Sequence, residues 1–376
     1  MRLGSNSKPL AVVVGFIGKL PYAGMSLYNL HYIRGLEALG YDVHYVERIN
    51  KAQECYDPGS RSSTDDPGFA VNYVRSLVPH FSYIDREDFC HGSDWNALRA
   101  ALQRADFVLT LADPTWFDEL GICPRRAFVD GDPMFTQIQA ADTLTHYTTL
   151  FTYATRMGMP DCDVPSLGRE WIKTRPVVST RDWTFAPLND HGPVTALMHW
   201  ASGSPVVWNG KQYGHKNREF EKFIDLPTRT STEFVLALGG RRAPREEISR
   251  NGWRLVDPLE MTGTMECYRA FIAESRIDFG IAKHAYVASR SGWFSDRSTC
   301  FLASGRPVLH QDTGCGDWLP VDSGVLLFSD TDGALEGLRE IEGDYQRHAR
   351  AARMLAEEYF EAANVICRML EDAGFR

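Results

Sequence analysis

Residues 10–47 read LAVVVGFIGKLPYAGMSLYNLHYIRGLEALGYDVHYVE. The continuous apolar, β-branched segment 10–17 is typical of a strand buried on both faces of a parallel sheet. A loop containing glycine and proline follows at 18–26, and a helical pattern over 27–39 ends at Gly40, a residue type that commonly closes a helix. A second strand is predicted at 42–47. This order of strand, helix and strand predicts a βαβ unit with a right-handed crossover.

The same alternation recurs along the chain. A first series is predicted to contain a helix at 95–104 and strands at 106–112, 126–130 and 148–153. A second series is predicted to contain strands at 194–200, 233–238, 253–256, 277–282 and 307–310, with helices at 219–224, after 245, at 265–274 and at 297–303. Alternating strands and helices build doubly wound sheets. The predicted fold class is therefore α/β, with two tandem Rossmann-like doubly wound domains.

A break in this pattern suggests where the domains divide. Residues 179–193, STRDWTFAPLNDHGP, contain two prolines and a glycine without periodicity, and we expect them to form a linker. The predicted units are an N-terminal domain at 1–185, a C-terminal domain at 186–345 and an amphipathic helix at 346–376. Apolar residues recur in this last segment at steps of three and four, so its apolar stripe is expected to pack at the seam between the domains.

Composition excludes several classes of protein. The chain has 376 residues and a formal net charge of −9, so nucleic acid and anionic membrane surfaces are not expected as main partners. No apolar run approaches the roughly 20 residues that cross a bilayer, and the first nine residues lack the pattern of a signal peptide. The eight cysteines include no C-x-x-C pair. We therefore expect a cytoplasmic protein with reduced thiols and no transmembrane segment.

One segment of the second series resembles a known family. Residues 301–308, FLASGRPV, follow a predicted helix and are similar to the M-A-x-G-x-P-V segment of GT-B-fold glycosyltransferases, especially bacterial family 4 and spore-coat-maturation-type members. Residues 317–320, DWLP, and 324–328, GVLLF, resemble the next loop and strand of the same proteins. The resemblance implies an interdomain cleft, a nucleoside-diphosphate sugar held mainly by the C-terminal domain and an acceptor held by the N-terminal one. It implies no separate cofactor and no obligatory metal.

The loop at 289–295, SRSGWFS, enters a predicted helix, whose free N–H groups and dipole favour an anion. Gly292 would let a diphosphate approach the backbone, and Arg290 and Arg297 would add positive charge. The alternative is that Ser295 and Asp296 only cap the helix.

This loop departs from the family pattern. The glutamate pair of family 4 would fall at Gly292 and Cys300, and neither residue is acidic. Asp296 or Ser298 is a possible replacement, so the donor identity and the retaining stereochemistry stay open.

Basic residues follow the first strand of the second series. In residues 209–217, NGKQYGHKN, Lys216 is the first candidate for contacting the diphosphate and Lys211 is the second. The resemblance places a basic loop here, and a departing phosphate needs positive charge. The alternative is a solvated basic turn. Weaker candidates of the same kind are Arg241, Arg242 and Lys283.

The N-terminal half contributes residues near strand ends. The resemblance places the acceptor and the donor phosphate near Gly24, in a loop that matches neither the dinucleotide nor the P-loop fingerprint. His31 lies in the helix that follows. It is a catalytic candidate, although a structural histidine is the alternative that we favour.

If the enzyme inverts the sugar, it needs a general base, and two aspartates in this half are candidates for it. Asp132, the second carboxylate of the D-x-D sequence at 130–132, is our first choice, and Asp113 is the next. A D-x-D pair holds a metal in GT-A transferases, but the order of strands and helices here argues against GT-A. A turn motif is the alternative.

The resemblance, together with these residues, implies a glycosyltransferase that moves a sugar from a nucleoside-diphosphate sugar to an unidentified acceptor hydroxyl or other nucleophile. Two alternatives stay open: a sugar-nucleotide epimerase or hydrolase of the same fold, and a non-catalytic sugar-nucleotide-binding protein. The sequence does not determine the oligomeric state.

Overall fold

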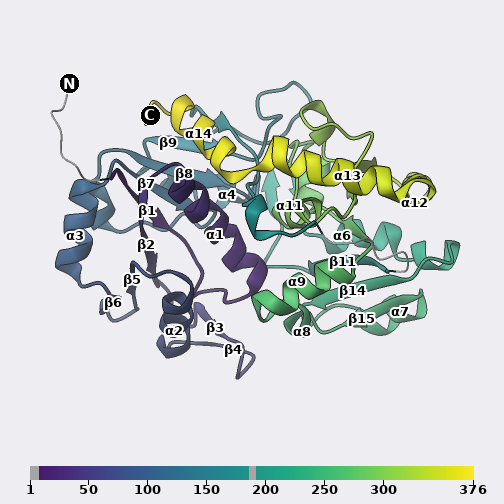
Figure 1. Cartoon of the computed structure of the whole chain (residues 1–376), viewed down its shortest axis with the longest axis horizontal. Coiled ribbons are helices and arrows are strands. Elements are labelled where there is room, and N and C mark those ends of the chain that lie inside the picture. The colour runs from purple at the N-terminus through teal and green to yellow at the C-terminus, as the bar shows by residue number, and fades with distance from the viewer. Residues whose placement is uncertain (1–7, 186–191) are drawn as a thin grey trace.

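Two separate parallel sheets organise the chain (Figure 1). The computed structural model describes residues 8–185 and 192–376. We call the parts that carry the first and second sheets the N-terminal half and the C-terminal half.

The N-terminal half is built on an eight-stranded sheet with the order β10-β9-β8-β7-β1-β2-β5-β6, in which only the β5–β6 pair is antiparallel. Its strands are β1 (Leu10–Val14), β2 (Asp42–Arg48), β5 (Phe81–Ile84), β6 (Cys90–Gly92), β7 (Phe107–Leu111), β8 (Arg126–Asp130), β9 (Thr149–Thr152) and β10 (Ile172–Lys173). Its helices are α1 (Ala23–Ala38), α2 (Gly68–Leu77), α3 (Trp95–Arg104), α4 (Phe135–Gln139) and α5 (Ala141–Leu144). A hairpin of β3 (Cys55–Asp57) and β4 (Ser62–Thr64) lies outside this sheet.

The C-terminal half is built on a six-stranded parallel sheet with the order β15-β14-β11-β16-β17-β18. Its strands are β11 (Val194–His199), β14 (Phe234–Gly239), β15 (Trp253–Val256), β16 (Ile277–Gly280), β17 (Val308–Gln311) and β18 (Val325–Phe328). Its helices are α6 (Asn217–Phe220), α7 (Arg245–Arg250), α8 (Pro258–Thr262), α9 (Met265–Glu274), α10 (His284–Ala288), α11 (Asp296–Ala303), α12 (Thr331–Gly343) and α13 (Tyr345–Leu355). A hairpin of β12 (Val206–Trp208) and β13 (Lys211–Tyr213) forms a separate two-stranded sheet.

The predicted α/β class and the alternation of strands and helices are confirmed. The most continuous apolar runs form strands that are buried on both faces of a parallel sheet, as all five residues of β1 are. The elements α2, β5 and β6 were not predicted, and the polar segment 50–67 contains the β3–β4 hairpin. The division at residues 185/186 and part of the expected linker fall on residues 186–191, outside the described residues.

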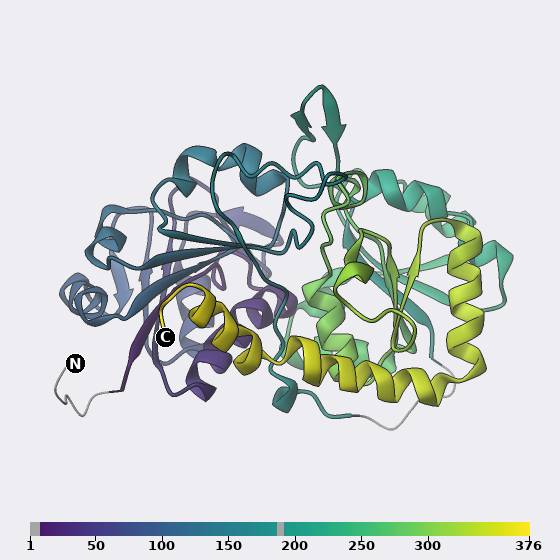
Figure 2. The ribbon, with the colours of Figure 1, turned by 90° about the horizontal axis from the view of Figure 1, so that it is seen from above.

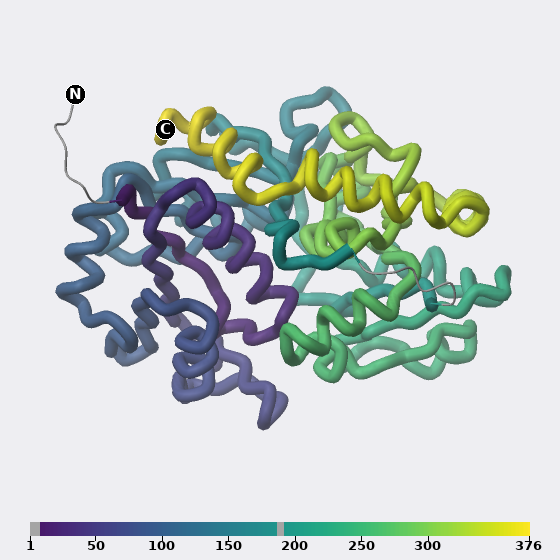
Figure 3. The backbone as a smooth tube through the Cα atoms, viewed as in Figure 1, coloured from purple at the N-terminus to yellow at the C-terminus, as the bar shows by residue number. Residues whose placement is uncertain are grey.

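The C-terminal segment differs from the single helix predicted at 346–376. It consists of α13, a π-helical turn at Ala356–Phe360 and α14 (Ala362–Asp372). The backbone leaves the helix at Glu361, which forms a β-bridge with Val178, and its carboxylate accepts hydrogen bonds from Thr180. These tertiary partners explain the break. The segment nevertheless runs across both halves (Figures 1 and 3). Its α14 packs on α1, where Gly35 faces Ile366.

Apolar packing joins the two halves. Ala23 and Leu27 of α1 belong to the same buried cluster as Phe294, Phe301 and Phe360. Figure 2 shows the two lobes in contact, with the C-terminal helices crossing from one to the other. Because these contacts are apolar and buried, they hold the carboxyl ends of the two sheets against a common junction.

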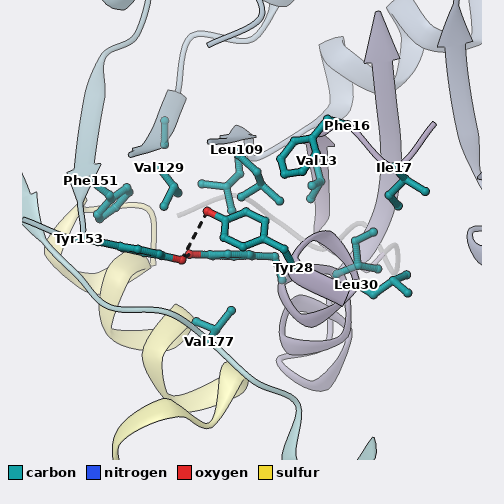
Figure 4. Packing of buried hydrophobic residues seen from close by; sticks show 14 of the residues in the cluster. Val13, Phe16, Ile17, Tyr28, Leu30, Leu109, Val129, Phe151, Tyr153 and Val177 are labelled. Carbon is teal, nitrogen blue, oxygen red and sulfur yellow. Dashed lines mark hydrogen bonds between the residues drawn. The ribbon is translucent and has the colours of Figure 1, made fainter. Parts of the chain in front are cut away.

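Tyrosines of the N-terminal half reach the same region. The hydroxyl groups of Tyr28 on α1 and Tyr153 after β9 lie 3.4 Å apart within the cluster in Figure 4. Tyr32 extends this contact, with its hydroxyl 2.9 Å from that of Tyr153. The cluster therefore ties α1 to the carboxyl end of the sheet. No helix among the described residues is long and apolar enough to span a membrane.

Candidate functional site

The carboxyl ends of the two sheets meet where the halves join. Asp132 follows β8 of the first sheet and Lys283 follows β16 of the second. Their side chains form an ion pair with 2.6 Å between Nζ and a carboxylate oxygen. Ligands of doubly wound sheets bind outside the carboxyl ends of the strands. This junction is therefore the place to look for a site.

Lys216 is a half-buried lysine at this junction. It immediately precedes α6, and its ammonium has no hydrogen-bond or ion-pair partner within residues 8–185 and 192–376. Burial, followed by the positive charges of Arg297 and Lys283, lowers the pKa of Lys216 to about 7. Removing an ammonium from water without a partner is unfavourable. Lys216 is thus arranged to receive an anion.

Buried nitrogens without a hydrogen-bond partner among the described residues occur beside Lys216. They are Nε of Arg297 and Nε2 of His310. Burial lowers the pKa of His310 to about 3, and the charges of Arg297 and Lys216 act in the same direction. Each such unpaired group costs roughly 1–3 kcal/mol, so few are retained in native structures. Their concentration here indicates a site suited to a polar ligand.

The first turn of α11 is anchored on the sheet. Asp278 of β16 accepts a hydrogen bond of 2.6 Å from the hydroxyl of Ser298 and lies 2.9 Å from Nη2 of Arg297. Nη1 of Arg297 donates to the carbonyl of Leu197 at 2.5 Å. The hydroxyl of Ser298 and two nitrogens of Arg297 are therefore used within the chain, and Nε of Arg297 is the guanidinium atom without a described partner.

Asp296 begins α11 at the same place. Burial raises the pKa of its carboxyl, whereas its own N–H, that of Arg297 and the charge of Lys216 act in the opposite direction. Among the described residues its carboxylate forms no ion pair. A carboxyl with a raised pKa close to a lysine with a lowered pKa is typical of functional sites.

Asp132 is presented by a turn that Asp130 organises. The buried carboxylate of Asp130 accepts hydrogen bonds from Gln137 at 2.6 Å and from the N–H of Asp132 at 2.9 Å. Asp132 then meets the other half, where the hydroxyl of Tyr286 donates to it at 2.5 Å and Lys283 pairs with it. Within the described ranges, no group of three or more His, Cys, Asp or Glu residues could hold a metal ion.

Gly292 has a role that the sequence did not predict. Its φ is +77°, and its N–H donates to the carbonyl of Thr313 at 2.8 Å. A Cβ at this position would lie 2.2 Å from Oγ1 of Thr155 in the N-terminal half. The space expected for a diphosphate at Gly292 is therefore occupied by protein, and this glycine allows the halves to interlock.

Two predicted cations are used in other ion pairs. Nε of Arg290 lies 2.9 Å from Asp161, and Nζ of Lys211 lies 3.0 Å from Asp163. Both basic side chains are at least half exposed. Because acidic partners already neutralise them, they are weaker candidates for phosphate binding than Lys216.

His31 has the environment of a structural histidine. It is buried, its Nδ1 accepts the N–H of Ser179 at 3.1 Å and its Nε2 lies 3.7 Å from Sγ of Cys300. Burial lowers the pKa of His31 to about 3. Both ring nitrogens have partners within the chain, so the structural alternative fits better than a catalytic role.

Asp113 and Gly24 lie at the edge of the first sheet, but not in the group around Lys216. Asp113 pairs with Nζ of Lys19 at 2.8 Å within its own half. Gly24 is the second residue of α1, and a Cβ there would approach the ring of Tyr268 to 3.9 Å. Gly24 therefore faces the C-terminal half, as expected for a residue at the junction.

The sequence did not single out Tyr286 or His310. Tyr286 lies on α10, three residues after the candidate cation Lys283, and this short separation in the sequence could have identified it. His310 lies in the apolar run of β17, where a buried histidine gives no separate signal. The structure thus brings together Lys216, Asp296 and Arg297, with Asp132 joined to them through Lys283.

No protein-family model and no curated protein matches the sequence. Among solved structures, an α-glucosyltransferase in complex with UDP and DNA matches with a TM-score of 0.61 at 10% identity, over 98% of this chain and 100% of that one. Anabaena HepE (Alr3699), in complex with UDP and glucose, matches with a TM-score of 0.57 at 8% identity, over 98% and 100%. AviGT4, a glycosyltransferase involved in avilamycin A biosynthesis, matches with a TM-score of 0.55 at 14% identity, over 97% of each chain.

The chain has the GT-B fold. The match to GT-B structures spans nearly the whole chain, so the resemblance noted for residues 301–308 extends at the level of fold to the N-terminal half, where the sequence offered only the order of elements. Lys216 and α11 belong to the C-terminal half of this GT-B chain, and Asp132 to the N-terminal half.

Proposed function

We propose that the protein transfers a sugar from a nucleoside-diphosphate sugar to an acceptor hydroxyl at the junction of its two halves. The single observation that carries the proposal is the ammonium of Lys216, which has no hydrogen-bond or ion-pair partner among the described residues, beside buried, unpaired nitrogens. A bound diphosphate would supply an anionic partner for the Lys216 ammonium and accept hydrogen bonds from the buried, unpaired nitrogens. Solved structures that share this fold include complexes with UDP, with UDP-glucose, and with UDP and glucose, which supports such a ligand.

In the proposed reaction, the protein stabilises the negative charge that develops on the leaving diphosphate more strongly in the transition state than in the bound donor. The acceptor oxygen bonds to the anomeric carbon, the bond from that carbon to the diphosphate oxygen breaks, and the electron pair leaves with the diphosphate. Lys216 and Nε of Arg297 stabilise the negative charge that grows on the leaving group. Asp132 receives the acceptor proton, and Asp296 contacts hydroxyl groups of the donor. No resident cofactor or obligatory metal is part of this proposal.

We also propose where in the cell the protein acts and what kind of acceptor it uses. All eight cysteines are free thiols, which fits a reducing compartment, and we place the reaction in the cytoplasm. The net charge of −9 disfavours a nucleic-acid acceptor, although one matching structure is a glucosyltransferase complex with DNA. We therefore propose an acceptor other than nucleic acid.

Calorimetric titration of the purified protein with UDP, ADP and GDP tests the proposal. We expect saturable binding of at least one diphosphate, and a sugar transferred from its UDP-sugar, ADP-sugar or GDP-sugar to an acceptor, detected by mass spectrometry. Incubation with the donor alone should release diphosphate only slowly; rapid loss would indicate a hydrolase, and a changed sugar an epimerase. Duplex DNA offered as the acceptor should receive no sugar, which tests the proposal of an acceptor other than nucleic acid. EDTA should leave the rate of sugar transfer unchanged, which tests the proposal that no metal is required. Absence of diphosphate binding would reject the proposal.

The binding of UDP-glucose is expected to depend on pH. The diphosphate binds the ammonium form of Lys216, whose pKa is about 7 in the free protein. Affinity should therefore be full below this value and fall above it, by up to about tenfold per pH unit. Titrations from about pH 6 to pH 9 measure this, because the diphosphate diester of UDP-glucose does not ionise in that range. The variant Lys216→Arg should give a flatter profile, since guanidinium stays charged; a flat wild-type profile would contradict the assignment.

A further inference from the structure

The carboxylate proposed as the base is held by the opposite half of the molecule. Asp132 comes from the loop after β8, and both groups that bind it, Nζ of Lys283 and the hydroxyl of Tyr286, come from the C-terminal half. Lys283 leads into α10 and Tyr286 lies on it. A carboxylate that already accepts two short charge-assisted hydrogen bonds is a poor proton acceptor. In this arrangement Asp132 is an ion-pair partner rather than a base.

Lys283 belongs to the electrostatic environment of Lys216 as well. Its positive charge is one of the causes that lower the pKa of Lys216, together with burial and Arg297. Of these three cations, Lys283 pairs with Asp132 and Arg297 with Asp278, whereas Lys216 has no described ionic partner. A diphosphate bound at Lys216 would bring two negative charges within the field of Lys283, in competition with the single charge of Asp132.

We propose that donor binding transfers Lys283 from Asp132 to the diphosphate, which leaves Asp132 with the hydrogen bond from Tyr286 alone and so lets it act as the base. This inference rests on the proposed function and adds a positioning role for Lys283. Asp132 is 37% exposed and Lys283 21% exposed, so both side chains have room to exchange partners without unfolding the core. The donor then binds before the acceptor can react.

The exchange of Lys283 fits a transfer step in which every bond, proton and electron pair is accounted for. The hydroxyl proton of the acceptor passes to Asp132 while its oxygen bonds to the anomeric carbon. The bond between that carbon and the diphosphate oxygen breaks, and the departing diphosphate keeps the electron pair. Lys283, now beside the diphosphate, adds to the charge of Lys216 as this negative charge develops. No further reactant is required.

The variant Asp132→Asn gives the decisive test, because the exchange predicts a gain rather than a loss of affinity. With Lys283 released from its carboxylate partner, UDP should bind about 3- to 10-fold more tightly by calorimetry, while sugar transfer is lost. Lys283→Ala should bind UDP more weakly than wild type. A role of Asp132 that is only structural, or direct contact with the donor, would leave the affinity for UDP unchanged or lower it; either result overturns the exchange.

The variant Asp113→Asn is the matched control. It removes a partly exposed aspartate of the same sheet edge that pairs with Lys19 of its own half, so its affinity for UDP should equal that of wild type. If Asp132→Asn does not fold, as judged by thermal unfolding, Asp132→Ser provides the same measurement with a smaller side chain. Initial-rate kinetics should also show ordered binding with the donor first; random order would contradict the exchange.

Failure of this inference can be separated from failure of the proposed function. If wild type does not bind UDP, ADP or GDP, the function itself is rejected. If one of these diphosphates binds in a manner that depends on Lys216, but Asp132→Asn gains no affinity for it, only the exchange is rejected.

Discussion

Replacing Lys216 with alanine should lower the affinity for UDP by about 100-fold. The ammonium is half-buried and has no described ionic partner, so its interaction with a diphosphate is not offset by the loss of an existing ion pair. Hydrogen bonds to charged groups contribute roughly 1.5–3 kcal/mol, which corresponds to about 10- to 150-fold in affinity. Calorimetric titration of wild type and Lys216→Ala with UDP measures the difference.

Lys211→Ala is the control for this experiment. Lys211 lies in the same loop region, five positions before Lys216, but its side chain is 68% exposed and paired with Asp163. Its removal should change the affinity for UDP by less than about threefold. Equal losses in both variants would point to a general effect of positive charge, and an unchanged affinity in Lys216→Ala would remove the basis of the proposed donor site.

The largest expected loss of stability among the predicted site residues is that of Gly292→Ala. The left-handed φ of +77° is unfavourable for alanine, and the added methyl group would overlap Thr155 and Arg156 of the N-terminal half. Backbone strain of about 1 kcal/mol and overpacking of roughly 1–3 kcal/mol together predict a loss near 3 kcal/mol. Urea unfolding monitored by tryptophan fluorescence measures it.

A second glycine separates these two causes. Gly210 has nearly the same φ, +76°, and a Cβ there would meet nothing within 4 Å. Gly210→Ala should therefore show the backbone strain alone, about 1 kcal/mol. A similar loss in both variants would mean that the contact of Gly292 with Thr155 does not constrain the junction.

The sequence was sufficient to predict those candidate site residues that directly follow a strand. Lys216 and Asp132 were identified because polar residues that follow buried strands of a parallel sheet gather at one edge. The roles of Arg297, Ser298 and Gly292 were not accessible in this way. Arg297 and Ser298 contact Asp278, and Gly292 lies against Thr155; both partners are distant in the sequence. These contacts decide which hydrogen-bond donors and how much space remain for a ligand.

Local patterns of apolar residues were enough to establish the α/β class, most strands and the presence of two successive sheets. Burial on both faces of a strand leaves a continuous apolar run in the sequence. Long-range contacts determined the rest. The C-terminal helix breaks at Glu361 because Val178 and Thr180 bind it there. Asp132 is held by Lys283 and Tyr286 only because folding brings the two sheet edges together, and no periodicity records a contact between residues about 150 positions apart.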